Sequence, residues 1–243
     1  MAWISPLLLA ALFLTAGPAL AQDDPVPFEC TGDAYTVRDS PAELFRIDQG
    51  SMPFVFEQIG DVLQGPFGPG GSLIDIQANN LGYDVVENVL YAVAIPLRGE
   101  ANFGIIKIDS NGTVFPVPSA LPSTRRFLAG DVSPDGSTFY LNTYPSSTMY
   151  IVDLDTMAVT PRALIGGPVS VADWAVNPID QMLYGAVGRG PTADTGGKVY
   201  RLNPDTGVIS LVGSPTGLPL ASGGNGQYFG GAWFNQFGLL FLY

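Results

Sequence analysis

The sequence of 243 residues contains no histidine, a single cysteine, and only 10 Lys and Arg residues against 22 Asp and Glu. Histidine is the commonest transition-metal ligand and the usual proton carrier near neutral pH. Its absence excludes a Ser–His–Asp triad and a His-ligated zinc site within this chain. Carboxylate chemistry and calcium binding remain open.

The shortage of basic residues gives a formal net charge of −12. Nucleic-acid binding proteins need a basic surface that exchanges with phosphate counterions, and anionic membranes attract the same kind of surface. We therefore expect no nucleic-acid partner. The acidity is better explained as a means of keeping a β-rich surface soluble.

The lone cysteine, Cys30, has no possible disulfide partner in this chain. An unpaired thiol in an oxidising compartment needs an explanation. The sequence leaves two: Cys30 is buried, or its partner lies in residues outside this chain.

Long apolar runs are absent after the first 21 residues, so we expect no membrane insertion of the mature chain. Residues 4–15 form a short apolar stretch, and Ala19-Leu20-Ala21 supplies a small-x-small cleavage pattern, although no Lys or Arg precedes it. These features predict a signal peptide over residues 1–21. The expected location is therefore secreted, either periplasmic or extracellular.

What the sequence does contain is a repeated strand pattern. Alternating apolar segments that end in Asp or Asn and a tight turn recur at 42–50, 104–112, 149–157 and 198–207. They alternate with segments in which a strand, a polar turn and a second strand follow one another, at 81–94, 130–143, 174–187 and 232–243. The second strand carries an aromatic residue each time: Tyr91, Tyr140, Tyr184 and Phe241.

Four short strands per unit of roughly 45–55 residues are typical of β-propellers. We predict an all-β fold of repeated four-stranded antiparallel blades over residues 28–243. The expected parts are a partial unit at 34–60, full units at about 82–117, 129–166 and 171–213, and a partial unit at 229–243. Because the chain stops on an apolar strand, we expect an incomplete ring from a larger propeller, with a closed four- or five-unit ring as the alternative.

The recurring pattern, seen best at 198–207 with 174–184 and at 44–48, resembles secreted bacterial and fungal propeller-like domains of unknown function. It is more distantly similar to the YVTN and quinoprotein-dehydrogenase-like propellers. The resemblance spans residues 28–243 and implies a propeller architecture. It implies no catalytic motif, and the segment Val86-Glu87-Asn88 departs from it by lacking the proline of the other turns.

A candidate ligand site follows from the loops. The longer connections, expected at 61–80, 95–103, 118–128, 188–197 and 214–228, should gather on one face, where loops commonly carry function. Four of the eight arginines lie in them: Arg98, Arg125, Arg126 and Arg189. One interpretation is a site for anionic groups or sugars; the other is solvated charge balanced by loop acids.

Other motifs are explained by turns. Asp153-x-Asp155 and Asn203-x-Asp205-x-Gly207 have too few oxygen ligands for a full calcium loop and fit hairpin turns better. We therefore predict no metal site, no cofactor and no catalytic residue.

The favoured function is a non-catalytic binding or interaction module whose partner is an unknown extracellular ligand or protein. The alternative is a propeller-type hydrolase or oxidoreductase, lactonase- or dehydrogenase-like, with its site at the channel mouth. Three or more converging carboxylate or Asn side chains at the channel would favour the enzyme.

Overall fold

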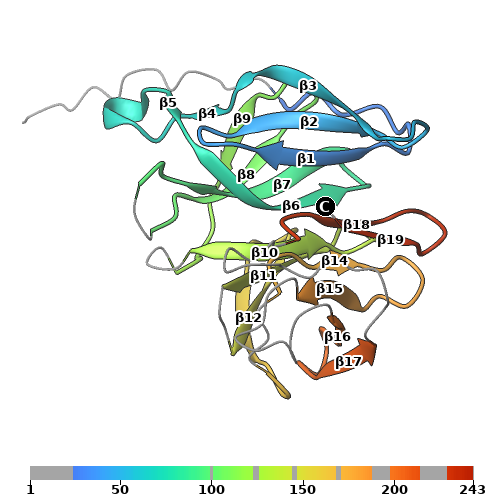
Figure 1. Ribbon diagram of the computed structural model, residues 1–243. Helices are drawn as coiled ribbons and strands as arrows, with labels where there is room; N and C mark the ends of the chain where they lie inside the picture. The colour runs from blue at the N-terminus through green and yellow to red at the C-terminus, as the bar shows by residue number, and fades with distance from the viewer. Residues whose placement is uncertain are drawn as a thin grey trace, which may run out of the picture.

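The computed structural model describes residues 24–98, 101–122, 126–143, 147–167, 171–187, 198–213 and 229–242. Its main feature is a set of four antiparallel sheets arranged as the blades of a β-propeller (Figure 1). This confirms the predicted fold class. No helix in these residues is long and apolar enough to cross a membrane.

The first blade has three strands, and the next three blades have four each. The first is formed by β1 (Ala34–Arg38), β2 (Glu43–Asp48) and β3 (Val55–Val62). The second is formed by β6 (Gln77–Asp84), β7 (Val89–Ile95), β8 (Gly104–Ile108) and β9 (Val114–Val117). The third is formed by β10 (Phe127–Val132), β11 (Thr138–Thr143), β12 (Thr148–Asp153) and β13 (Val159–Ala163). The fourth is formed by β14 (Ala175–Val176), β15 (Leu183–Val187), β16 (Lys198–Leu202) and β17 (Ile209–Gly213).

The turns of the blades follow the local chemistry expected from the sequence. Asp153 Oδ1 accepts the Thr156 N–H at 2.8 Å, and Asn203 Oδ1 accepts the Asp205 N–H at 2.9 Å. A side-chain oxygen that bonds to the backbone two or three residues ahead stabilises a tight turn. These bonds confirm that the two motifs form hairpin turns.

Burial follows the two-residue period of the strands, because alternate side chains point to opposite faces of a sheet. Every residue of β7 is buried. Leu90, Ala92 and Ala94 pack toward the first blade, whereas Tyr91 and Val93 pack toward the third. A further cluster of buried side chains, including Met149 and Trp174, joins the third blade to the fourth. The core therefore lies between the blades.

The C-terminal hairpin of β18 (Ala232–Phe234) and β19 (Leu240–Leu242) packs against β14 of the fourth blade and also contacts the turn after β2 in the first blade. Figure 1 shows it in red between β14 and the blue and green strands β1 and β6. Trp233 stacks on Phe241 and packs against Phe54, in the turn between β2 and β3. Its Nε1–H donates to Gln49 Oε1 at 3.3 Å. The hairpin thus bridges the sheets at the two ends of the described chain.

One expectation about the loops was wrong. Residues 61–80 are not a plain loop: they include the end of β3, a small sheet of β4 (Gln64–Gly65) and β5 (Ile74–Asp75), a 3₁₀ turn (Pro69–Gly71) and the start of β6. Leu63 and Ile76 are fully buried against the second blade. Their burial explains why this connection is ordered as sheet.

Candidate functional site

Two of the four predicted arginines fall in the described residues. Arg98 is exposed after β7, and Arg126 is half-buried just before β10. Arg126 Nη2 donates to Gln77 Oε1 at 3.0 Å, so it ties the third blade to the start of the second. Within the described residues, Arg98 and Arg126 share no hydrogen-bond partner. Arg125 and Arg189 lie outside the described residues, and the proposed arginine site therefore stays a prediction.

A different pocket lies on the first blade. Its volume is about 300 Å³, at the lower end of the range for small-molecule sites. Strand residues Tyr35, Arg46 and Glu57 line it, together with Gln58 and Ile59. The segment before β1 supplies the rest of the wall: Phe28, Glu29 and Thr31.

The pocket is built on a cross-strand row of side chains. Tyr35 of β1 pairs with Arg46 of β2, and Arg46 pairs with Glu57 of β3. Directly opposed residues in antiparallel strands project on the same face and contact one another. The register therefore places an aromatic ring, a cation and a carboxylate side by side.

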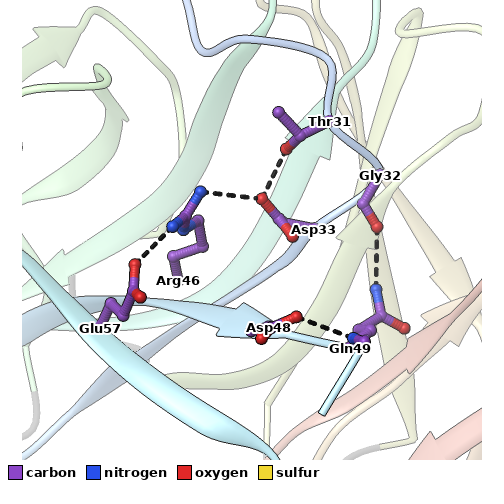
Figure 2. A network of polar contacts seen from close by, with 8 residues as sticks. Thr31, Gly32, Asp33, Arg46, Asp48, Gln49 and Glu57 are labelled. Atoms are coloured by element: carbon purple, nitrogen blue, oxygen red, sulfur yellow. Dashed lines mark hydrogen bonds and ion pairs between the residues drawn. The ribbon is translucent and has the colours of Figure 1, made fainter.

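Two carboxylates hold the guanidinium of Arg46 in place, as Figure 2 shows. Arg46 Nη1 donates to Asp33 Oδ2 at 3.3 Å, and Nη2 donates to Glu57 Oε2. Thr31 Oγ1–H donates to the same Asp33 oxygen at 2.6 Å. Hydrogen bonding to Glu57, followed by the charges of Glu57 and Asp33, raises the pKa of Arg46. The positive charge of Arg46 is thus balanced by the carboxylates of Asp33 and Glu57, and it offers little attraction to an anionic ligand.

The N-terminal segment reaches the pocket because it is fixed to the turns of the second blade. Val26 N–H donates to Asp109 Oδ2 at 3.2 Å, and Phe28 N–H donates to the Asn88 carbonyl at 2.7 Å. Phe28 then packs on Tyr35, with ring centroids 4.6 Å apart, and Tyr35 stacks on Tyr83 at 5.9 Å. Phe28 and Tyr35 form the apolar wall of the pocket, and Tyr83 packs behind Tyr35.

These two tyrosines keep their protons. Burial, followed by the negative charge of Asp33, raises the pKa of Tyr35. Burial also raises the pKa of Tyr83 to about 12. Both phenols therefore remain hydrogen-bonding hydroxyls at neutral pH, and neither supplies a phenolate base.

Cys30 is exposed near this wall. Of the two explanations that the sequence left open for Cys30, burial is therefore wrong, and a partner outside this chain stays a prediction. The segment of residues 24–33 runs along the surface between two blades, and only Phe28 of that segment is buried.

The centre of the propeller holds a second polar group. Asp131 of β10 accepts the Val132 N–H and the Val176 N–H, both at 2.8 Å. Asp173, just before β14, accepts the Trp174 N–H and the Ala232 N–H, both at 2.9 Å. Each carboxylate therefore links its own inner strand to the next.

The surroundings of these two carboxylates leave them poorly hydrated. Desolvation raises the pKa of Asp131 to about 7, opposed by its backbone hydrogen bonds. Desolvation also raises the pKa of Asp173 well above the ordinary value, and the nearby charge of Asp131 adds to the effect. Both residues are half-buried, and the protein around them replaces part of their contact with water, which disfavours the charged form.

Asp131, Asp173 and Asn80 are three polar side chains near the centre of the propeller. A group of three such side chains was expected to favour an enzyme. The adjoining cavity is only about 40 Å³. That is space for a few water molecules, too small for a sugar lactone. Within the described residues, no group of three or more His, Cys, Asp or Glu is placed to hold a metal ion. The geometry is therefore that of a structural link between blades, with little room for a substrate.

The four blades define a β-propeller repeat protein. Residues 34–242 match the model of a family described as a repeat of unknown function (DUF6923), and the chain belongs to that family. The expected resemblance to propeller-like domains of unknown function is confirmed. A search of curated proteins found no match.

Two solved structures have similar backbones. One is an auxiliary nutrient binding protein from Bacteroides thetaiotaomicron, with a TM-score of 0.47 and 11% identity, covering 79% of this chain. This chain spans 40% of that protein. The other is described as a putative 6-phosphogluconolactonase from Bacteroides uniformis, with a TM-score of 0.47 and 14% identity, covering 89% of this chain and 76% of that one. The likeness concerns the backbone alone.

Sequence reasoning missed the row of Tyr35, Arg46 and Glu57. The signal was available: Arg46 lies in the same repeat position as Lys107 and Arg201, one residue before the Ile or Leu that precedes the turn. Each of these cations pairs with a tyrosine on the neighbouring strand. Aligning the strand over 34–37 with the later aromatic strands would have identified Tyr35.

Proposed function

We propose that this protein is a secreted, non-catalytic binding module, and that the pocket on the first blade holds a neutral polyhydroxyl compound of about monosaccharide size. The observation that carries the proposal is the row of Tyr35, Arg46 and Glu57 along a pocket of about 300 Å³. Secretion is supported by the apolar stretch at 4–15 and the cleavage pattern before Gln22.

The charge of the lining decides the class of ligand. Glu29 and Glu57 outnumber the one guanidinium, and Asp33 already engages that guanidinium from behind the row. A phosphorylated or carboxylated ligand would meet uncompensated negative charge at this site. Such ligands are therefore disfavoured.

The hydrogen-bonding groups fit hydroxyls. Carboxylates accept only, the amide of Gln58 both donates and accepts, and the hydroxyl of Tyr35 does either. The hydroxyl of Thr31 donates its proton to Asp33 and is left to accept. A sugar hydroxyl can donate to Glu57 while it accepts from one of the neutral groups. The rings of Phe28 and Tyr35 provide apolar surface for the C–H face of such a ligand.

Binding is tested by isothermal titration calorimetry with a panel of neutral monosaccharides and disaccharides, together with their phosphorylated forms. We expect saturable binding of at least one neutral sugar and weaker binding of its phosphate. Glu57→Gln should weaken that binding at least tenfold, because charge-assisted hydrogen bonds are roughly twice as strong as neutral ones.

The matched control is Glu87→Gln. Glu87 forms an ion pair with Lys107 on the second blade, and it does not line the pocket. Binding by this variant should equal that of the unmodified chain. Absence of binding to every neutral sugar, or equal loss in both variants, would contradict the proposal.

The enzymatic alternative rests on Asp131 and Asp173. It predicts turnover of lactones or sugar acids that disappears in Asp131→Asn. The small cavity and the backbone hydrogen bonds on both carboxylates favour the binding module, which predicts no turnover of these substrates.

A further inference from the structure

The centre of the propeller contains a polar side chain that no described group satisfies. Asn80 of β6 is 2% exposed, and neither its Oδ1 nor its Nδ2 has a hydrogen-bond partner in the structure. Leaving a buried amide unpaired costs free energy comparable to several lost hydrogen bonds. An occupant that supplies the missing contacts would recover that cost.

Asn80 lies beside a small cavity that several inner strands share. Thr36 of β1, Asn80 of β6, Asp173 before β14, and Gly231 and Trp233 at β18 all contribute to its wall. Its volume of about 40 Å³ admits a few waters, or one ion with part of its hydration shell.

The backbone is shaped to leave room for Asn80. A side chain at Gly130 would have its Cβ 2.1 Å from the Tyr140 carbonyl oxygen and 3.2 Å from Asn80 Nδ2. The Gly130 N–H also reaches Asp173 Oδ1 at 3.4 Å. Glycine at this position avoids a clash with the Tyr140 carbonyl and leaves room for the Asn80 amide, which lines the same cavity as Asp173.

The carboxyl groups of Asp131 and Asp173 have no positively charged partner within the described part of the chain. Their oxygens accept backbone N–H groups, but each carboxylate oxygen has two lone-pair sites. Among the described residues, Asp173 Oδ2 accepts the Ala232 N–H alone, so it retains a site for another partner.

We propose that this cavity binds a hard cation, with Asn80 Oδ1 and Asp173 Oδ2 as protein ligands and the charge of Asp131 in support. An all-oxygen set of carboxylate, amide and water suits Ca²⁺, which accepts irregular geometry and 6–8 oxygens. With so few protein ligands, affinity should be on the order of 0.1–1 mM, as in extracellular calcium modules. This site is separate from the pocket on the first blade and does not depend on the function proposed for it.

The test uses Tb³⁺ as a luminescent Ca²⁺ analogue, excited through Trp233 in the cavity wall, followed by competition with Ca²⁺. We expect saturable luminescence that Ca²⁺ displaces. Asp173→Asn and Asn80→Ala should each weaken binding at least tenfold. The control, Asp155→Asn, removes a surface carboxylate beside the turn of Asp153 and should leave binding unchanged.

A fourth variant keeps the test valid if the others fold poorly, as checked by circular dichroism. Asn80→Asp preserves the shape of the side chain and adds a negative charge, and Asp tolerates the positive φ of 60° found at this position. It should bind Tb³⁺ and Ca²⁺ more tightly. No saturable binding by the unmodified chain, equal binding after Asp173→Asn, or unchanged or weaker binding by Asn80→Asp would each overturn the proposal.

Discussion

The first and second blades use the same repeat position in opposite ways. In the second blade, Tyr91 pairs with Lys107, and the next strand places Phe115 opposite the lysine. In the first blade, Tyr35 pairs with Arg46, and the next strand places Glu57 there. Tyr91 is 1% exposed, with the Lys107 ammonium 5.2 Å from its ring centroid, whereas Tyr35 is only half-buried and lines a pocket.

The packing around the repeated tyrosine–cation pair therefore determines whether the pair is buried in the core or lines a pocket. The second blade is covered on both sides, because β7 packs against the first blade on one face and the third blade on the other. The corresponding row of the first blade is bordered by the segment of residues 24–33 and two exposed acids. The same tyrosine–cation pair therefore stabilises the core in one blade and forms a polar surface in the other.

The largest expected effect comes from truncating the two tyrosines. Tyr91→Ala should lower the free energy of unfolding by about 3–5 kcal/mol, as for other buried aromatic side chains. Tyr35→Ala should cost clearly less stability but abolish sugar binding. Urea denaturation and calorimetry measure the two quantities, and an equal loss of stability in both variants would break the comparison.

The next expected effect is a dependence of the free energy of unfolding on pH. The pKa of Asp131 is about 7 in the folded protein, against an ordinary value of 3.8. The folded state then holds the proton more tightly, so the free energy of unfolding should fall as pH rises between these values. Carboxyls with lowered pKa, such as Asp135 and Asp153, act in the opposite sense and only below about pH 4.

In calcium-free buffer, the free energy of unfolding of Asp131→Asn should fall less steeply with pH than that of the unmodified chain. The substitution also removes one acceptor for a backbone N–H. Chemical denaturation at pH 4.5, 5.5, 6.5 and 7.5 measures the slope. A decline as steep as that of the unmodified chain would show that Asp131 is already ionised across this range.

The smallest expected effect is a difference in stability between variants of the two cations, Lys107 and Arg46. Lys107→Met should destabilise the protein more than Arg46→Met, because the Lys107 side chain is 21% exposed and covers Tyr91, whereas that of Arg46 is 40% exposed. Thermal denaturation of the two variants measures the loss of stability in each. A larger loss for Arg46→Met would contradict the prediction.

The blades could be predicted because the same pattern of strands and turns repeats along the sequence. Alternating strands and the turns at Asp153 and Asn203 reflect contacts within one unit, which a local pattern records. The tyrosines Tyr91, Tyr140 and Tyr184 recur because each occupies the second strand of its blade.

The candidate sites were less predictable because they depend on contacts between units. Arg46 is held by Asp33 from a segment that belongs to no blade, and the path of that segment is set by Asp109 and Asn88 of the second blade. Asp131 accepts an N–H from the next inner strand, at Val176. Nothing in the spacing along the chain specifies such partners.

The most direct test of the central claim is to map a bound sugar by amide chemical-shift changes in a ¹⁵N-labelled sample. We expect the largest shifts at Tyr35, Arg46, Glu57 and Gln58, with those at Tyr91 and Lys107 close to zero. Shifts centred on the second blade or on the axial residues, with none along the first-blade row, would contradict it.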